Sequence, residues 1–259
     1  MDLGITGRTA IVCASSQGLG LACARALAEA GVSVVVNGRN RTVLERSAEE
    51  IRRATGALVT PVVADVSTQE GQEALLAACR TPDILVNNNG GPPFRDFREL
   101  DRQAMLTGVT MNMVTPIELI QKVIDPMVAR GFGRIVNITS ISVKMPLAGL
   151  DLSSGARAGL TAFVAGIARK VADKNVTINN LLPGSFDTQR LRGAFAAAAQ
   201  KTGKPESALT ALAMAEIPAK RFGTPAEFGH TCAFLCSVHA AYITGQNILL
   251  DGGAYPAAF

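Results

Sequence analysis

The sequence predicts one doubly wound α/β domain, in which a parallel seven-stranded sheet carries helices on both faces. Three observations predict this fold. Short apolar runs alternate with amphipathic stretches of helical period. The first unit, residues 9–40, is a strand, a tight turn, a helix and a second strand, which form one right-handed βαβ crossover. No second domain, repeat or low-complexity linker divides the 259 residues.

The composition excludes several classes of function. A net charge of +4 without a dense Lys/Arg cluster argues against nucleic-acid binding and suits an anionic small molecule. No apolar run has the length of a membrane span, and residues 1–9 lack a signal core, so we expect a cytoplasmic protein without membrane contact. Five cysteines lie in apolar patterns, which predicts buried thiols and no metal site: Cys13, Cys23, Cys79, Cys232 and Cys236.

The strands are expected where the apolar runs are short and bounded by turn residues. Helices are expected where apolar residues recur every three or four positions. Within the long helical stretch 98–129, Pro116 predicts a kink and Pro126 predicts the helix end. Thr224 is the expected N-cap of the last large helix, with Pro225 at its first position. The expected strands are 10–13, 32–36, 58–64, 83–87, 133–139, 176–181 and 248–250.

The turn after the first strand suits a diphosphate. Gly18 and Gly20 open the first helix, where backbone N–H groups and the helix dipole attract an anion. Many strand-to-helix turns carry glycine for steric reasons alone, so the βαβ context is what favours a dinucleotide site.

This turn resembles the T-G-x-x-x-G-x-G signature of the short-chain dehydrogenase/reductase family, with Ala14 in place of the first glycine. The resemblance extends over nearly the whole chain and implies a Rossmann-type fold. It is greatest to the 3-oxoacyl-carrier-protein reductases, and it implies a homotetramer. It also implies that the following residues bind the cofactor: Ala14, Ser16, Gln17, Gly18, Leu19 and Gly20.

Arg39 follows the second strand, where a carboxylate would bind the adenosine 2′-hydroxyl. The run 37–41 contains no acid, and a cation there suits a 2′-phosphate. NADP(H) is therefore expected, with NAD(H) as the alternative. Arg39 could also simply begin the next helix on a solvated face.

Three later segments also match the family pattern. Asp65-Val66 ends the third strand, where the resemblance implies contacts to adenine. Residues 87–91 resemble the N-N-A-G segment, which implies that Asn88 and Gly90 lie near the cofactor ribose. Residues 183–188 resemble the P-G-x-x-x-T segment, which implies that these residues lie by the nicotinamide: Pro183, Gly184, Phe186 and Thr188.

The catalytic segment departs from the family pattern. Ser140 resembles the serine that hydrogen-bonds the substrate carbonyl, and Asn112 resembles the asparagine that holds a proton-relay water. The family's tyrosine and lysine follow that serine four residues apart on one helix. Here those positions are Ser153 and Arg157. Arg157 retains the positive charge and a hydrogen-bond donor to the cofactor ribose, but an aliphatic hydroxyl is shorter and far less acidic than a phenol.

Three hypotheses remain open. The first is an active NADP(H)-dependent reductase with another proton donor, for which Lys144 is the main candidate. Asp151 is a weaker candidate, and it could instead cap the helix. The second is a different reaction in the same pocket, and the third is a cofactor-binding sensor or scaffold without turnover.

The substrate is expected to be a carbonyl compound or alcohol, either free or bound to an acyl carrier. Two short amphipathic helices in a lid around 189–218 favour a substrate with an apolar part. The loop 91–94 is a candidate pocket wall.

Overall fold

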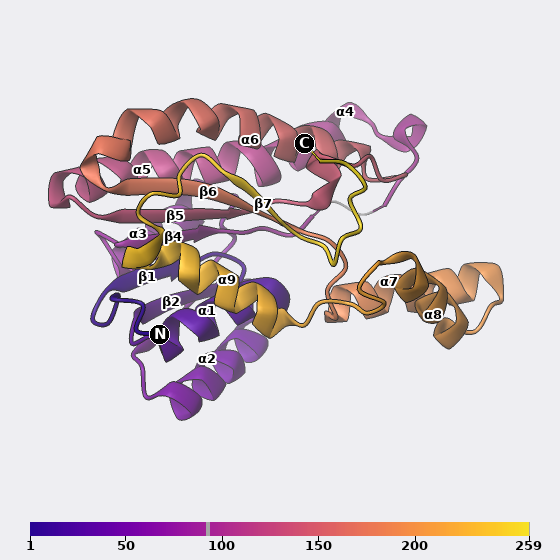
Figure 1. Cartoon of the computed structure of the whole chain (residues 1–259), viewed down its shortest axis with the longest axis horizontal. Helices are drawn as coiled ribbons and strands as arrows, with labels where there is room; N and C mark the ends of the chain where they lie inside the picture. The colour runs from indigo at the N-terminus through magenta and orange to yellow at the C-terminus, as the bar shows by residue number, and fades with distance from the viewer. Residues whose placement is uncertain (92–93, 259) are drawn as a thin grey trace.

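The computed structural model describes residues 1–91 and 94–258. Within these residues, seven parallel strands form one sheet, as predicted (Figure 1). Their order in the sheet is β3-β2-β1-β4-β5-β6-β7. The order reverses direction between β1 and β4, which is where doubly wound sheets bind ligands. The strands are β1 (Thr9–Val12), β2 (Ser33–Gly38), β3 (Val59–Val63), β4 (Ile84–Asn87), β5 (Gly133–Ile138), β6 (Val176–Pro183) and β7 (Asn247–Leu250).

Helices cover both faces of the sheet. On one face lie α1 (Gly18–Glu29), α2 (Arg41–Thr55) and α9 (Pro225–Cys236). On the other lie α3 (Gln69–Ala78), α5 (Thr115–Arg130) and α6 (Asp151–Val171). β1 shows why both faces are apolar: Val12 points into the first layer and Ile11 into the second.

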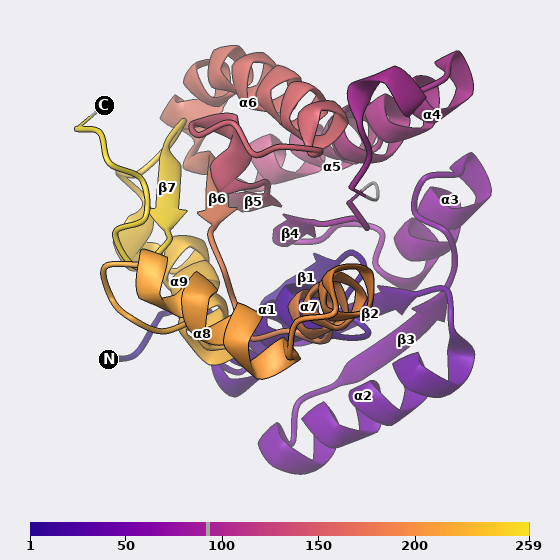
Figure 2. The same ribbon diagram turned by 90° about the vertical axis from the view of Figure 1, so that its right-hand side faces the viewer.

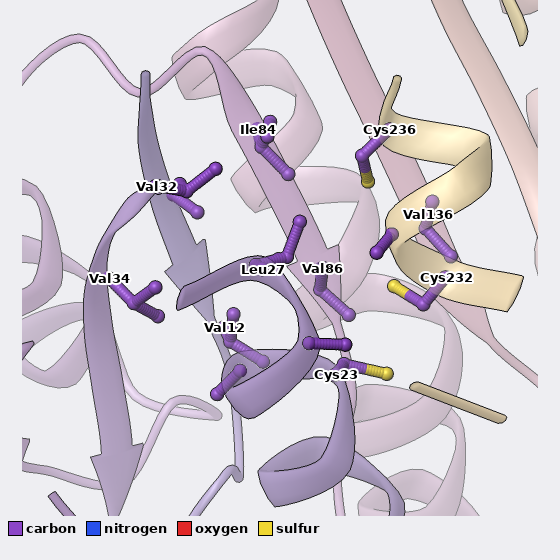
Figure 3. Close-up of a cluster of buried hydrophobic side chains, with 14 of the residues drawn as sticks. Val12, Cys23, Leu27, Val32, Val34, Ile84, Val86, Val136, Cys232 and Cys236 are labelled. Carbon is purple, nitrogen blue, oxygen red and sulfur yellow. The ribbon is translucent and has the colours of Figure 1, made fainter. Parts of the chain in front are cut away.

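The layer between the sheet, α1 and α9 contains three of the buried thiols. Cys23, Cys232 and Cys236 lie among valines and leucine in Figure 3. Hydrogen bonding between the thiols and burial raise the pKa of Cys232 and of Cys236. Burial raises the pKa of Cys13, on the opposite layer, to about 12. The prediction of buried free thiols is thus confirmed for these four residues, whereas Cys79 is half-buried.

The predicted single helix at 98–129 is divided. A short 3-10 turn (Phe97–Glu99) and α4 (Arg102–Val109) precede a π-helical segment (Thr110–Val114), and α5 follows with Pro116 in its first turn. The prediction that Pro126 ends the helix is wrong, because α5 continues to Arg130 and ends at Gly131. The carbonyl that loses its partner to Pro126 belongs to Lys122, which is exposed, so water can satisfy it.

Asp151 is the first residue of α6 rather than its N-cap, which is Leu150. The capping alternative for Asp151 is therefore wrong; its carboxylate lies in the first turn, where it complements the helix dipole. Thr224 does cap α9 as predicted, in a capping box with Glu227.

Two helices fill the predicted lid segment: α7 (Gln189–Thr202) and α8 (Glu206–Glu216). Neither contains a buried residue in the described structure. They project from the side of the molecule where β6 ends (Figures 1 and 2). Residues 92 and 93 of the predicted pocket wall lie outside the described residues. No helix in the described ranges is long and apolar enough to cross a bilayer.

Candidate functional site

The β1–α1 turn is held by side chains from two neighbouring strands. Ala14 adopts a φ of 43°, a left-handed conformation that usually favours glycine. The Asn37 side chain accepts a hydrogen bond from the Ala14 N–H (3.2 Å), and Asn88 Nδ2 donates to the Ala14 carbonyl (3.1 Å). These two amides hold Ala14 in a backbone conformation that glycine would adopt more readily.

The two glycines of this turn have different roles. Gly18 has a φ of 62°, and the nearest atom to a Cβ added there would be a Thr188 carbon 4.0 Å away. A Cβ on Gly20 would instead lie 2.5 Å from the Ala14 carbonyl oxygen and 2.8 Å from Asn88 Nδ2. Gly18 therefore leaves the turn open to a ligand, whereas Gly20 allows the turn to pack on itself.

The N-terminus of α1 suits an anion. Its N-cap, Gln17, makes no side-chain capping bond, and the first turn carries no acidic residue. The first N–H groups of α1 thus have neither a side-chain cap nor a competing carboxylate, and the helix dipole favours negative charge there. Ser16 and Leu19 flank this end. The residues present fit the diphosphate of a dinucleotide.

Arg39 and Asp65 lie together at the ends of β2 and β3. Arg39 Nη1 is 3.8 Å from Asp65 Oδ2, and the Arg39 side chain is 74% exposed. An exposed guanidinium in a long ion pair contributes little to stability and is available to a phosphate. Val66, next to Asp65, is buried.

The segment after β6 has one residue, Thr188, beside the β1–α1 turn and another, Phe186, in the core. Thr188 caps α7 through its hydroxyl, next to the open side of Gly18. The Phe186 ring is 6% exposed and packs edge-on against Phe228 at 5.3 Å between ring centroids. Phe186 thus places its side chain in the core of the α9 layer. Pro183 is the register partner of Leu250, the last residue of β7. Gly184 packs closely against Asp251, the next residue in the chain.

Arg157 is the central cation of the predicted catalytic segment. It is 8% exposed, and its Nη1 donates to the Ile138 carbonyl (2.6 Å) while its Nε donates to Ser153 Oγ (3.2 Å). Burial, and secondarily the charge of Arg190, lowers the pKa of Arg157 to about 10. The guanidinium is therefore still charged at neutral pH. The i, i+4 spacing brings Ser153 and Arg157 together as predicted.

A small cavity brings three of the predicted residues together. Asn88, Asn112 and Arg157 all line it, at the ends of β4 and β5. Its volume of about 10 Å³ is close to that of one water molecule. Within the described structure, three buried oxygens on its lining residues have no protein partner: Asn87 Oδ1, Asn112 Oδ1 and Thr115 Oγ1. The Asn112 amide nitrogen donates to the Gly108 carbonyl at 3.2 Å.

A row of asparagines across the sheet is a feature that sequence reasoning missed. Asn87 Nδ2 donates to Asn137 Oδ1 (2.9 Å), Asn137 Nδ2 donates to Asn180 Oδ1 (2.9 Å), and Asn180 Nδ2 donates to Asn247 Oδ1 (2.8 Å). The four residues are register partners on β4, β5, β6 and β7. An asparagine in each of four consecutive, otherwise mainly apolar strands is the signal that could have found this asparagine row.

Ser140 and Lys144 lie in the loop after β5 but outside the cavity lining. Ser140 Oγ accepts a hydrogen bond from the Ser142 N–H at 3.1 Å. The Lys144 ammonium lies 5.5 Å from the centroid of the Tyr255 ring, within the range of a cation–π contact. Tyr255 was not a predicted site residue, because it lies more than a hundred positions from Lys144 in the sequence.

No group of three or more His, Cys, Asp or Glu side chains suited to a metal occurs in the described part of the chain. Near the cysteines, His230 lies 4.0 Å from Glu29, and the His239 ring bonds the Asp2 carbonyl.

Residues 13–255 match a family model described as enoyl-(acyl carrier protein) reductase. The chain belongs to the short-chain dehydrogenase/reductase family. It is 32% identical to the NADPH-dependent reductase BacG of Bacillus subtilis over 95% of this chain and 97% of that protein. It is 30% identical to the 3-oxoacyl-[acyl-carrier-protein] reductase FabG of Vibrio cholerae over 98% and 99%.

Solved structures of reductases share the fold. The L-sorbose reductase of Gluconobacter frateurii, crystallised with NADPH and L-sorbose, superposes with a TM-score of 0.94 at 29% identity. The match covers 99% of this chain and 100% of the sorbose reductase. The resemblance and the fold class predicted from the sequence are thus confirmed. Ser153 and Arg157, which the motif predicts at the family's tyrosine and lysine positions, lie together on α6.

Proposed function

We propose that this chain is an NADP(H)-dependent oxidoreductase that reduces a carbonyl group or oxidises the corresponding alcohol. The open N-terminus of α1, with Arg39 exposed beyond the neighbouring strand, is the observation that carries the proposal. The NADPH-dependent relatives support the same cofactor. NAD(H) is the less favoured alternative, since residues 37–41 supply cations and no carboxylate.

The proposed cofactor site follows the carboxyl edge of the sheet. The β1–α1 turn would bind the diphosphate through backbone N–H groups, and Arg39 would bind the 2′-phosphate. When bound, the cofactor supplies or accepts a hydride. The remaining contacts are assigned to Ala14, Ser16, Gln17, Gly18, Leu19, Gly20, Asp65, Val66, Asn88, Gly90, Arg157, Pro183, Gly184 and Thr188. Phe186 would contribute only its backbone, because its ring packs against Phe228 in the core.

Two residues would act on the substrate oxygen, and two more would support them. Ser140 would donate a hydrogen bond to it, which requires the hydroxyl hydrogen to point away from the Ser142 N–H that its oxygen now accepts from. Arg157 would stabilise negative charge there as the carbonyl is reduced. Asn112 would hold a water in the cavity through its unpaired Oδ1. Ser153 would orient Arg157 through the hydrogen bond that its hydroxyl accepts from Nε.

The proton must come from a group other than the missing phenol at position 153. Lys144 is our candidate donor, because it lies four residues after Ser140 in the same loop. Its ammonium contacts the Tyr255 ring, which fixes the direction of an otherwise flexible side chain. This contact places Tyr255 beside the proposed donor.

The lid and the relatives together suggest the kind of substrate. α7 and α8 project beside the proposed site without burying any of their own described residues, so they could close over an apolar group. Relatives named for 3-oxoacyl-[acyl-carrier-protein] make a carrier-bound substrate one candidate. We also propose a cytoplasmic homotetramer, on the family resemblance, which light scattering after size-exclusion chromatography would test.

A second candidate function is a cofactor-binding sensor or scaffold. The replacement of the acid/base phenol by Ser153 favours it, since losing a positioned acid or base typically lowers a rate by about 10²- to 10⁴-fold. In that case NADPH would bind without being consumed.

One paired experiment tests both candidates. Calorimetry measures NADPH and NADH affinity, and a panel of carbonyl substrates is followed through NADPH absorbance. Binding with consumption supports the oxidoreductase, and binding without consumption supports the sensor. If consumption occurs, Lys144→Ala should abolish it while leaving NADPH affinity unchanged, and unchanged turnover would eliminate Lys144 as the donor. Absence of affinity for either nucleotide would overturn both candidates.

A further inference from the structure

The π-helical segment at 110–114 deprives the Met111 carbonyl of its usual helical partner. In an α-helix this carbonyl would accept from the Thr115 N–H, but that N–H donates to the Thr110 carbonyl instead. In the π-helical register the partner would be residue 116, which is a proline and has no N–H. A buried carbonyl without a donor is unfavourable, so a donor from outside the helix is expected at Met111.

The Asn89 side chain supplies this donor. Its Nδ2 donates to the Met111 carbonyl at 3.3 Å and to Ser67 Oγ at 3.0 Å. Its Oδ1 accepts from the Gly90 N–H at 2.8 Å, and turning the amide over would set acceptor against acceptor at Met111. One half-buried side chain thus joins the loop after β4 both to the π-helical segment and to the loop after β3.

The Met111 carbonyl matters because Asn112 follows it directly in the chain. Asn112 is buried, and its Oδ1 has no partner among the described residues. Asn89, Met111 and Asn112 all line the small cavity at the ends of β4 and β5. A contact that fixes the Met111 peptide therefore also fixes Asn112 at this cavity. The N-N-A-G pattern that residues 87–91 resemble has alanine at position 89, so the pattern itself assigns Asn89 no role.

We propose that Asn89 is a positioning residue, whose amide replaces the N–H that Pro116 lacks and so holds Asn112 in place. The second donor of the same amide attaches the segment to Ser67, whose own N–H donates to Asp65 Oδ1 at 2.9 Å. Without the Asn89 amide, the Met111 carbonyl would lose its donor and the segment would open more readily. This inference rests on the proposed function, because the role of Asn112 belongs to that function.

Hydrogen exchange followed by mass spectrometry tests the contact without depending on turnover. In the nucleotide-free protein, peptides covering 110–115 should exchange about tenfold faster in Asn89→Ala than in the wild type, because the segment loses its outside donor. Gln103→Ala is the matched control, since it removes an exposed amide that bonds only within α4, to Thr107, and should leave these peptides unchanged. Equal exchange in Asn89→Ala and the wild type would overturn the proposal.

Asn89→Asp provides a second variant if Asn89→Ala does not fold. It keeps the shape of the side chain and the acceptor for the Gly90 N–H, but it loses both donors. The peptides covering 110–115 should again exchange faster than in the wild type. Unchanged exchange in this variant would show that the donors of Asn89 do not hold the segment.

Pro116→Ala distinguishes this role from a general effect on the loop. Its new N–H can donate to the Met111 carbonyl, so Asn89→Ala should speed exchange much less in a Pro116→Ala background. A loss that arises at Gly90 or Ser67 would be the same in both backgrounds, and that result would overturn the proposal. If NADPH is consumed, kcat should fall in Asn89→Ala and recover in the double variant, and a fall without recovery would also count against the proposal. Failure of the proposed function would be distinct, because wild-type protein would then bind no nucleotide while the exchange pattern remained.

Discussion

The sequence predicts departures from the family pattern at two places, the β1–α1 turn and the start of α6, and the two predicted departures differ in kind. At the turn, Ala14 is predicted at a glycine position, and it has a φ of 43° with hydrogen bonds on both sides. On α6, Ser153 is predicted at the position of a phenol, which has a different acidity. A substitution that alters only shape can be absorbed by neighbouring residues. One that removes a titratable group cannot be, because packing does not supply a proton.

We therefore expect different functions for the β1–α1 turn and for the start of α6. The turn retains open N–H groups at the α1 N-terminus, so we expect nucleotide binding to persist. The α6 region retains a positive charge at Arg157, so we expect it to stabilise an anionic group, while proton transfer requires another residue.

Restoring the tyrosine and lysine is the strongest test of this comparison. The Ser153→Tyr/Arg157→Lys double variant should raise kcat for carbonyl reduction by about 10²- to 10⁴-fold, because it returns a positioned acid/base. Stopped-flow NADPH oxidation measures the gain. Arg157→Lys alone should show no gain. If the double variant binds NADPH and remains folded but shows no gain, the departure is not confined to these two positions.

Closing the turn should affect binding next most strongly. Gly20→Ala places a methyl group 2.5 Å from the Ala14 carbonyl oxygen, and the turn must shift to relieve this contact. We expect NADPH affinity to fall by about 10- to 100-fold, as measured by calorimetry. Gly166→Ala is the control, since a Cβ there meets nothing within 4 Å. Unchanged affinity in Gly20→Ala would show that the diphosphate does not depend on this turn.

Removing Arg39 should separate the two cofactors. Arg39→Ala should weaken NADPH about tenfold more than NADH, because a charge-assisted bond to the 2′-phosphate is lost. Arg41→Ala should not discriminate, since Arg41 is paired with Glu45 on α2. Equal losses for the two cofactors in Arg39→Ala would argue against the phosphate contact.

The smallest expected effect concerns the strain at Ala14. Ala14→Gly should raise the free energy of unfolding by at most about 1 kcal/mol, because relief of the left-handed conformation exceeds the added entropy of the unfolded chain. Urea unfolding measures it. Ala165→Gly, at an exposed position inside α6, should instead lower stability by about 1 kcal/mol. Destabilisation in both variants would show that Ala14 is not strained.

The fold could be predicted from the sequence because apolar periodicity and turn residues are local signals. The positions of the strands and of the lid helices follow from them. The π-helical segment at 110–114 could not be predicted, because its hydrogen bonding is set by tertiary packing. The prediction that Pro126 ends the helix failed for a different reason. Proline removes one backbone hydrogen bond, but the freed carbonyl belongs to Lys122, which is exposed to water.

The candidate site was predictable only in part. The i, i+4 pair on α6 follows from helix geometry, so the proximity of Ser153 and Arg157 was predicted correctly. The contacts of Arg190 with Gly91 and of Lys144 with Tyr255 join residues about a hundred positions apart, and a single sequence carries no signal for them.

The asparagine row makes some positions much less tolerant than others. Every amide in it points the same way, so none can turn over alone without setting donor against donor or acceptor against acceptor. Replacing Asn137 or Asn180 with leucine would orphan a donor on one neighbour and an acceptor on the other, whereas replacing Asn247 would orphan a donor only. Asn137 and Asn180, on the two inner strands, are therefore the positions of the asparagine row that tolerate substitution least.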